Sequence, residues 1–369
     1  MSESIRILHM IGSLNVGGSQ AMIINLHKAI DKSKVQFDYI VDHPDQLYYE
    51  SVVKELGGKI YCMPTFKGYN LFEIRKAWKQ FFKDHPEYKI LHSHVRSYAS
   101  LYLPIAKNAG LKTIIHSHNT SSGKGLKAVV KFCLQRGLRK NVDYYFACSD
   151  VAGKWLFGEE ITKQSNYHVL NNAIDVEKYA YSEMSRKKIR DEFNLKNELV
   201  VGHVGRFHPQ KNHSFLVDIF AEIHKKRPDS VLMLVGTGDL MDSVKEKAAE
   251  LKLDDSVIFT GSRADVNELL SAFDVFVFPS LFEGLPVTLV EVQAAGLPCF
   301  SSDTVTKEVD FDRKINYISL DKDAAYWADE IINGKPERLD HTEAIRKAGY
   351  DIQYTVKELT SFYQKLAGS

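Results

Sequence analysis

The chain has 369 residues, of which 44% are hydrophobic and 26% are charged, so its length suggests two domains and its composition excludes overall disorder. Its 48 Lys and Arg nearly balance 47 Asp and Glu, which argues against a globally basic nucleic-acid-binding protein. No apolar run approaches the roughly 18 residues that span a bilayer, the N-terminus lacks the apolar region of a signal peptide, and the four cysteines are too dispersed for a disulfide or zinc scaffold. We therefore expect a cytoplasmic two-domain α/β protein.

Short apolar runs alternate with amphipathic segments in the first half of the chain. The alternation is typical of βαβ units that build a parallel sheet. Predicted strands occupy residues 5–11, 35–41, 59–63, 89–93, 112–116 and 142–148, and predicted helices include residues 20–30 and 71–82. A short strand within residues 166–175 and a charged, largely helical stretch at residues 177–196 then interrupt the series.

The alternation restarts after this connection. Predicted strands lie within residues 198–205, 230–236, 256–261, 274–280 and 296–302, and predicted helices cover residues 212–226, 239–251 and 286–295. Two Rossmann-like domains follow, residues 1–176 and 177–353, with a terminal helix in residues 354–369. That helix carries an apolar stripe that must dock on the protein, formed by Leu359, Phe362, Tyr363 and Leu366.

Positive charge is concentrated in the first domain. Residues 1–176 hold 23 Lys and Arg against 15 Asp and Glu, whereas the remainder holds 25 against 32. Residues 124–140 combine cations with an apolar stripe, as in a basic amphipathic helix at an anionic membrane surface. An ordinary surface helix packed on its own domain is the alternative. The cations of this candidate membrane and acceptor patch are Lys124, Lys127, Lys131, Arg136, Arg139 and Lys140.

Glycine-rich turns follow the strands at which open parallel sheets bind ligands. Gly17 and Gly18 lead directly into a predicted helix, so the backbone can approach a ligand and the helix N-terminus favours an anion. The spacing is not GxGxxG, and Asp42 near the end of the second strand is only weak support for a nicotinamide cofactor.

The second domain begins with a charged turn. Residues 205–211 read GRFHPQK, and Arg206 and Lys211 offer a guanidinium fork and an ammonium group that together suit a diphosphate. Taken alone, the two residues are also compatible with ordinary surface cations. Gly205 in this turn, with Gly236 and Gly238 after the next strand, allows close approach of two successive loops to a ligand.

Two glutamates follow a later strand. Glu283 lies in the loop after the strand at residues 274–280, and Glu291 lies eight residues further on, about two turns into an apolar helix. Glu291 is therefore either a packing residue or a ligand-binding one. Carboxylates accept two hydrogen bonds from vicinal hydroxyls, and paired carboxylates also occur in glycoside hydrolysis. The nearby cations and glycine turns favour a sugar nucleotide.

These motifs in this order resemble the retaining glycosyltransferases of family 4, which have the GT-B fold of two Rossmann-like domains facing across a cleft. The resemblance rests on Glu283–x7–Glu291, on GRxxxxK at residues 205–211, on NVGGSQ near the N-terminus and on VLNNAID at the domain junction. It is strongest to bacterial enzymes that build exopolysaccharide or capsule. It implies that the terminal helix crosses back onto the first domain.

The resemblance also assigns roles to residues. It implies that Arg206 and Lys211 hold the donor diphosphate, Glu291 the ribose hydroxyls and Glu283 the transferred sugar. It places Gly17 and Gly18 near the donor phosphates and acceptor, and His118 of HSHNT close to the reacting sugar. Many members have Gly-x-Gly after the first glutamate, but this chain has Pro286, which cannot donate a hydrogen bond. Backbone contacts to sugar and phosphate must then come from Gly284, Leu285, Val287 or Thr288.

A metal is not expected. His92, His94, His116 and His118 alternate at two strand ends and offer four imidazoles to zinc, but no cysteine or acid completes such a site. The run Asp321-Lys-Asp323 imitates a DxD metal motif, and we interpret it as a helix cap. The resemblance implies metal-independent catalysis, in which Arg206 and Lys211 supply the stabilising charge.

The sequence thus predicts a retaining, metal-independent hexosyltransferase without a cofactor. It would move a sugar from a UDP-sugar to a lipid-linked glycan acceptor in exopolysaccharide or capsule synthesis, at the inner face of the cell membrane. The alternatives are a sugar-nucleotide epimerase or hydrolase on the same fold, and a non-catalytic glycan-binding subunit. The intact set Arg206, Lys211, Glu283 and Glu291 counts against the last.

Overall fold

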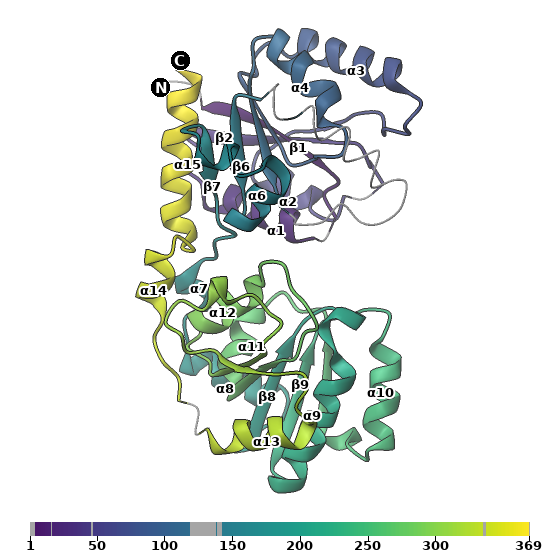
Figure 1. The fold of residues 1–369 in the computed structure, drawn as a ribbon, viewed down its shortest axis with the longest axis vertical. Helices are drawn as coiled ribbons and strands as arrows, with labels where there is room; N and C mark the ends of the chain where they lie inside the picture. Colours follow the sequence, from purple (N-terminus) through teal and green to yellow (C-terminus); the bar gives the residue numbers. More distant parts are fainter. Residues whose placement is uncertain are drawn as a thin grey trace. The chain divides into compact units, whose positions relative to one another are not determined.

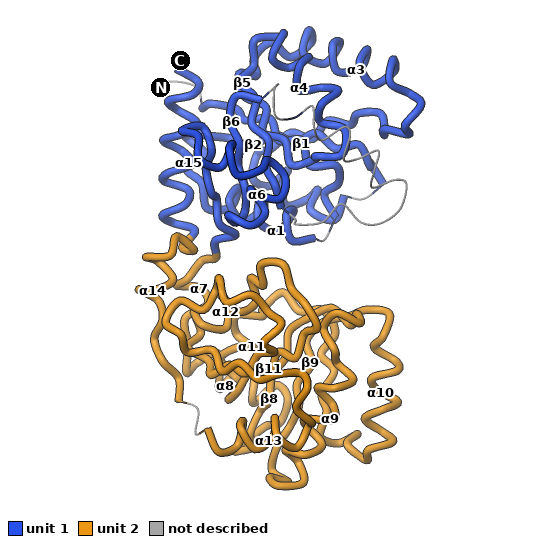
Figure 2. The backbone as a smooth tube through the Cα atoms, in the orientation of Figure 1, with its two compact units in different colours: residues 1–173, 352–369 blue, residues 174–351 orange. Residues whose placement is uncertain are grey.

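The computed structural model describes residues 4–15, 17–45, 47–118, 138, 142–334 and 337–368. The chain forms two compact units (Figure 2), unit 1 from Met1–Ala173 with Ile352–Ser369 and unit 2 from Ile174–Asp351. Each unit contains one parallel sheet with helices packed against it (Figure 1). The predicted class, two Rossmann-like α/β units, is confirmed.

The described part of unit 1 has a seven-stranded sheet in the order β3-β2-β1-β4-β5-β6-β7, and all neighbouring strands are parallel. The sequence order reverses between β1 and β4. The strands are β1 (Ile5–Gly12), β2 (Val35–Val41), β3 (Ile60–Cys62), β4 (Ile90–Ser93), β5 (Lys112–Ser117), β6 (Tyr144–Ala147) and β7 (Tyr167–Val169).

Helices cover both faces of this sheet because its strands are apolar on both sides. Alternate residues of β1 enter two separate cores: Leu8 packs with the α3 and α4 side, and Ile7 with the α1 and α15 side. The helices are α1 (Gly18–Ala29), α2 (Glu50–Glu55), α3 (Leu71–Asp84), α4 (Ala99–Asn108), α6 (Asp150–Phe157) and α15 (Ile352–Ala367).

Helix α15, the last element of the chain, belongs to unit 1. Its stripe residues Leu359, Tyr363 and Leu366 are buried against the core around β1 and β2. Phe362 is half-buried and meets the rings of Tyr144 and Phe146 edge-on. The C-terminal segment therefore completes one face of the N-terminal sheet.

The described part of unit 2 has a six-stranded parallel sheet in the order β10-β9-β8-β11-β12-β13, which reverses between β8 and β11. Its strands are β8 (Leu199–Val204), β9 (Ser230–Val235), β10 (Val257–Gly261), β11 (Val275–Phe278), β12 (Cys299–Ser302) and β13 (Asn316–Ile318). Its helices are α7 (Val176–Tyr179), α8 (Glu183–Glu192), α9 (His213–Lys226), α10 (Met241–Glu250), α11 (Val266–Ala272), α12 (Val287–Ala294), α13 (Ala324–Asn333) and α14 (Thr342–Lys347).

Within the described ranges, no helix combines the length and the apolar character that crossing a bilayer requires.

Candidate active site

The predicted donor-site residues follow the strands at which the order of each sheet reverses, or the strands next to them. In an open parallel sheet, the loops at such a point diverge and ligands bind beside the carboxyl ends of the strands. In unit 2 the loops after β8 and β11 carry Lys211 and Glu283, and the loop after β9 carries Gly236. In unit 1 the loop after β1 carries Gly17 and Gly18, and His118 directly follows β5.

Lys211 and Glu283 form a largely buried ion pair between the loops after β8 and β11. Lys211 Nζ lies 2.8 Å from Glu283 Oε1, and the two side chains are 17% and 8% exposed. Gln210 Nε2 donates to the second oxygen, Glu283 Oε2, at 3.0 Å. Lys211 Nζ also lies 4.6 Å from the centre of the Phe278 ring. The ammonium group is thus held in place and shielded from water beside a carboxylate that balances its charge, so an anionic ligand would compete with Glu283 for it.

Backbone hydrogen bonds join the same two loops. Leu281 N–H donates to the Gln210 carbonyl at 2.8 Å, and Asn212 Nδ2 donates to the Pro279 carbonyl at 3.1 Å. Asn212 has a left-handed backbone (φ 57°) at the start of α9, a conformation that asparagine tolerates better than most residues. The turn is therefore fixed on both sides of Lys211.

Arg206 has a different setting from Lys211. Its side chain is 68% exposed, and its Nη2 atom lies 3.8 Å from Oδ2 of Asp239, which is 88% exposed. Such a surface pair contributes little energy, so the guanidinium is easily redirected to a ligand. Lys211 is therefore paired with Glu283, whereas Arg206, in the same loop, is exposed to solvent.

Two glycines after β9 are required by close packing against the β8 loop. Gly236 has φ 139°, and a Cβ there would lie 2.2 Å from the Gly205 carbonyl oxygen. Gly238 has φ 157°, and its Cβ would lie 2.4 Å from the Phe207 carbonyl oxygen. Their direct role is to bring the two loops together, which positions Arg206 and Lys211.

Helix α12 begins at Val287, after the loop that follows β11. Pro286 precedes the helix, and Val287 N–H donates to the Leu285 carbonyl at 3.0 Å. Of the four backbone donors predicted here, Val287 is therefore already engaged in the turn. Gly284 is exposed, with open space beside its α-carbon. Leu285 and Thr288 are half-buried.

Glu291 lies on α12 and has a partner that the sequence did not reveal. The Tyr179 hydroxyl, on α7, donates to Glu291 Oε1 at 2.8 Å. Burial raises the pKa of Glu291 to about 7, and the Tyr179 hydrogen bond opposes that rise. Asp175 caps α7 by accepting the Lys178 N–H at 3.1 Å. The capping residue Asp175 is the last residue of the VLNNAID motif, but nothing in the sequence indicates that Tyr179 contacts Glu291.

The predicted glycines of unit 1 lie at the start of α1. The helix begins at Gly18, and the carbonyl of Gly17, which has an extended backbone, accepts the Ala21 N–H at 2.8 Å. A Cβ on Gly18 would meet nothing within 4 Å. The loop is thus open at Gly18.

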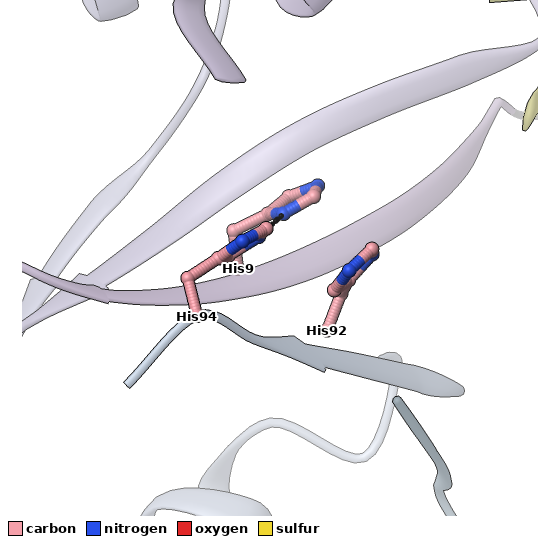
Figure 3. Close-up of side chains that lie close together, drawn as sticks. All are labelled: His9, His92 and His94. Carbon is pink, nitrogen blue, oxygen red and sulfur yellow. Dashed lines mark hydrogen bonds between the residues drawn. The ribbon is translucent and has the colours of Figure 1, made fainter. Parts of the chain in front are cut away.

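His118 belongs to a cluster of histidines at the ends of β1, β4 and β5. Its Nε2 atom lies 2.8 Å from His94 Nδ1, and burial lowers its pKa to about 3. Two groups of three nitrogens lie within 4.8 Å of one another and could hold a metal, one on His9, His92 and His94 (Figure 3) and one on His94, His116 and His118. The sequence indicated four of these residues but not His9.

Two other interpretations of the sequence concern the DxD-like run and the basic patch. Asp323 caps α13, its Oδ1 atom accepting the Tyr326 N–H at 2.8 Å, so the DxD-like run is a helix cap as predicted. The candidate patch of Lys124, Lys127, Lys131, Arg136, Arg139 and Lys140 lies outside the described residues.

Comparison with known proteins identifies the family. The profile described as "Glycosyltransferase Family 4" matches residues 16–178, and that described as "Glycosyl transferases group 1" matches residues 198–333. EpsF of Bacillus subtilis (strain 168), named as a glycosyltransferase, is 33% identical over 372 residues, covering 98% of this chain and 97% of EpsF. The chain belongs to glycosyltransferase family 4. It is a glycosyltransferase, as the motifs predicted.

Two further proteins are similar to this family 4 protein. The "UDP-Gal:alpha-D-GlcNAc-diphosphoundecaprenol alpha-1,3-galactosyltransferase" of Escherichia coli is 30% identical over 227 residues, 59% of this chain and 58% of that enzyme. The crystal structure of Anabaena HepE in complex with UDP has a TM-score of 0.78 at 17% identity, covering 98% of this chain and 100% of HepE. HepE is also solved with UDP-glucose, at a TM-score of 0.71. These likenesses confirm the GT-B fold.

Proposed function

We propose that this glycosyltransferase moves a hexose from a UDP-sugar to a lipid-linked glycan acceptor, with retention at the anomeric carbon, in exopolysaccharide or capsule synthesis. The observation that carries the donor assignment is the shielded Lys211 ammonium beside Glu283 at the strand reversal of unit 2. The UDP and UDP-glucose complexes of HepE support the nucleotide, and the name of the Escherichia coli enzyme supports a lipid-linked acceptor.

Each group in unit 2 has a distinct task in this proposal. Lys211 and Arg206 neutralise the diphosphate as the bond between the anomeric carbon and its phosphate oxygen breaks. Glu291 accepts the ribose hydroxyls, and Glu283 contacts the transferred sugar. The backbone of Gly205, Gly236, Gly238, Gly284, Leu285 and Thr288 lines the donor. From unit 1, His118 contacts the reacting sugar, and Gly17 and Gly18 adjoin the phosphates and acceptor. The acceptor oxygen forms the new bond to the anomeric carbon, and its proton passes to the oxygen of the departing diphosphate.

No metal is needed for this assignment. A divalent ion would serve to neutralise the departing diphosphate, and here two cationic side chains supply that charge. Lys211 is pre-positioned by its ion pair, so little reorganisation accompanies the reaction.

A donor screen tests the proposal. We expect one UDP-sugar to raise the melting temperature, with and without EDTA, because a ligand at about 100 times its Kd adds about 2.7 kcal/mol of stability. GDP- and ADP-sugars serve as controls. The matching donor should be consumed only with a lipid-linked acceptor, and NMR should show the donor's anomeric configuration in the product. Consumption without acceptor would indicate an epimerase or hydrolase, and loss of activity in EDTA would contradict metal independence.

We further propose that unit 1 binds an anionic membrane, and helix α3 supports this in addition to the predicted patch. Ile74, Trp78, Phe81 and Phe82 bury one face of α3. On the opposite face Phe72 is 91% exposed, and Lys76, Lys79 and Lys83 continue it at helical spacing. Arg75 flanks this stripe, and Tyr69, 81% exposed, precedes it.

Among the described residues, the cations of this α3 stripe, Arg75, Lys76, Lys79 and Lys83, form no ion pair. The same helix carries two acids, Glu73 and Asp84, so its net charge is positive. Unpaired cations beside protruding aromatic rings suit anionic headgroups, because the charges attract the phosphates and the rings enter the interface.

The double variant Lys76→Gln/Lys79→Gln should bind vesicles containing phosphatidylglycerol about 30-fold more weakly at low salt, since each cation near such a surface contributes about 1 kcal/mol. Vesicle sedimentation measures this. The control Lys314→Gln/Lys322→Gln removes the same charge from exposed positions of unit 2 and should change little. Phe72→Ser should weaken binding at both low and high salt. Equal binding of the unmodified protein to neutral vesicles would contradict the proposal.

A further inference from the structure

Gln210, which precedes Lys211 in the loop after β8, contacts three consecutive residues of the loop after β11. Its backbone carbonyl accepts the Leu281 N–H at 2.8 Å. Its side-chain Nε2 atom donates to the Phe282 carbonyl at 2.9 Å and to Glu283 Oε2 at 3.0 Å. Gln210 therefore links the loop that carries the donor-site cations directly to the Glu283 carboxylate.

The orientation of the Gln210 amide follows from its partners. A carbonyl oxygen and a carboxylate oxygen both accept hydrogen bonds, so only the NH2 end of the amide can satisfy Phe282 and Glu283 together. Both of its N–H groups are thereby used. Because the amide is neutral, it completes this contact without placing a second cation beside the ion pair of Lys211 and Glu283.

The Glu283 carboxylate is held at both of its oxygens. Lys211 Nζ lies 2.8 Å from Oε1 and Gln210 Nε2 lies 3.0 Å from Oε2, and no other hydrogen bond to this carboxylate occurs among the described residues. A carboxylate held at one oxygen can still turn about its terminal bond, whereas donors at both oxygens fix its plane. Each oxygen accepts about two hydrogen bonds, so about one acceptor position with a fixed direction remains on each.

The side chain of Gln210 is not needed to join the two loops. One backbone bond between them uses the Gln210 carbonyl, and Asn212 Nδ2 donates to the Pro279 carbonyl at 3.1 Å. Neither contact involves the Gln210 amide, so replacing the side chain leaves both in place. The effect of the amide is then confined to the Phe282 carbonyl and the Glu283 carboxylate.

We infer that Gln210 is a positioning residue, which sets the orientation of the Glu283 carboxylate and thereby the hydroxyl pattern of the sugar that the site accepts. Two acceptor positions with fixed directions suit two neighbouring hydroxyls of a hexose, and an epimer that differs at one of them loses a hydrogen bond. The inference rests on the proposed contact between Glu283 and the transferred sugar. It assigns Gln210 no contact with the uridine or the diphosphate.

Binding of UDP and of two UDP-hexoses separates the sugar from the nucleotide. Gln210→Met keeps the length of the side chain and removes both donors. Of UDP-glucose and UDP-galactose, the one that the unmodified protein binds more tightly should bind about tenfold more weakly, while the Kd of UDP changes less than twofold. The ratio of the two hexose Kd values should move towards one. Calorimetric titration measures all three ligands, and Gln364→Met, at an exposed position of α15, is the matched control.

The outcomes of this titration are distinct. Equal weakening of UDP and of the UDP-hexose would show that the side chain supports the whole loop, and this would overturn the inference. No change in either ligand, or an unchanged ratio between the two hexoses, would overturn it as well.

A second replacement tests whether Gln210 acts through Glu283. In a Glu283→Ala background, Gln210→Met should weaken binding of the same UDP-hexose by less than twofold, since the carboxylate that the amide orients is absent. A further tenfold loss would show that the amide acts elsewhere in the loop, which contradicts the inference.

The crystal structure of Gln210→Met, compared with that of the unmodified protein, decides the inference without any ligand. Glu283 Oε1 should stay within reach of Lys211 Nζ while the carboxylate plane turns and Oε2 shifts. A carboxylate in unchanged orientation would overturn the inference. If the unmodified protein binds no UDP-hexose, the proposed function fails, and this structure still decides whether Gln210 positions Glu283.

Discussion

Replacing Lys211 by methionine is expected to lower kcat about 100- to 1,000-fold, the usual effect of removing one pre-positioned group that stabilises developing charge. Methionine retains much of the apolar stem that packs beside Phe278 and removes only the ammonium group. The charge on the departing diphosphate then loses its shielded partner. Initial rates at saturating donor, compared with the unmodified protein, measure the effect.

The ion pair complicates this variant. Glu283 is 8% exposed and would lose its cationic partner, and an uncompensated buried charge costs about 3–5 kcal/mol. The Gln210 hydrogen bond to Glu283 remains and offsets part of that cost. A drop in activity could thus come from a distorted loop.

The double variant Lys211→Met/Glu283→Gln distinguishes the two causes. It removes the unpaired charge, so the melting temperature should return towards that of the unmodified protein while kcat stays low. Recovery of kcat together with stability would show that the pair is structural and would contradict the diphosphate role. Arg206→Gln gives a second comparison: its side chain is 68% exposed, so turnover should fall with almost no change in stability.

The fold was predictable because each repeat carries a local signal. Apolar strand runs, glycines at their carboxyl ends and amphipathic helices recur in both halves, and this alternation permits few topologies other than a parallel sheet. The apolar stripe of α15 could be recognised in the sequence for the same reason. The three-residue strand β13 was absent from the prediction, although the equally short strands β3 and β7 were predicted.

The site was predictable only as far as its residues follow strands. Lys211, Glu283 and Glu291 stand at positions that the topology makes informative. Their partners do not: Tyr179 is 112 residues from Glu291 in the sequence. His9 is 85 residues from His94 and lies within a strand that reads as core. Such pairs depend on the register of adjacent strands and the packing of distant helices, which local patterns do not encode.

The affinity for UDP-glucose is expected to fall as the pH is lowered through about 7, by up to tenfold per unit. Burial raises the pKa of Glu291 to about 7, so near neutral pH the carboxyl group is only partly ionised. Ribose hydroxyls donate to the carboxylate form, so binding favours ionisation. UDP-glucose is the suitable probe because its diphosphate is esterified at both ends and does not titrate in this range.

In the free protein, stability changes with pH in the direction opposite to that of the donor affinity. A raised folded-state pKa means that the contribution of Glu291 is complete below 4.5, its ordinary value, and is lost as the pH rises through about 7. Raising the pH through this window should therefore destabilise the free protein through this group, while donor binding becomes stronger. Thermal unfolding with and without UDP-glucose should diverge accordingly.

Two variants test the assignment to this carboxyl group. Glu291→Gln should flatten the pH dependence and weaken binding at pH 8 by about 10- to 100-fold, because hydrogen bonds to a charged group are replaced by neutral ones. Tyr179→Phe removes the hydrogen bond that lowers the Glu291 pKa, so the profile should move to higher pH and keep its shape. Calorimetric titration from pH 5.5 to 8.5 measures both. An unchanged profile in Glu291→Gln would assign the pH dependence to another group and remove Glu291 from the ribose site.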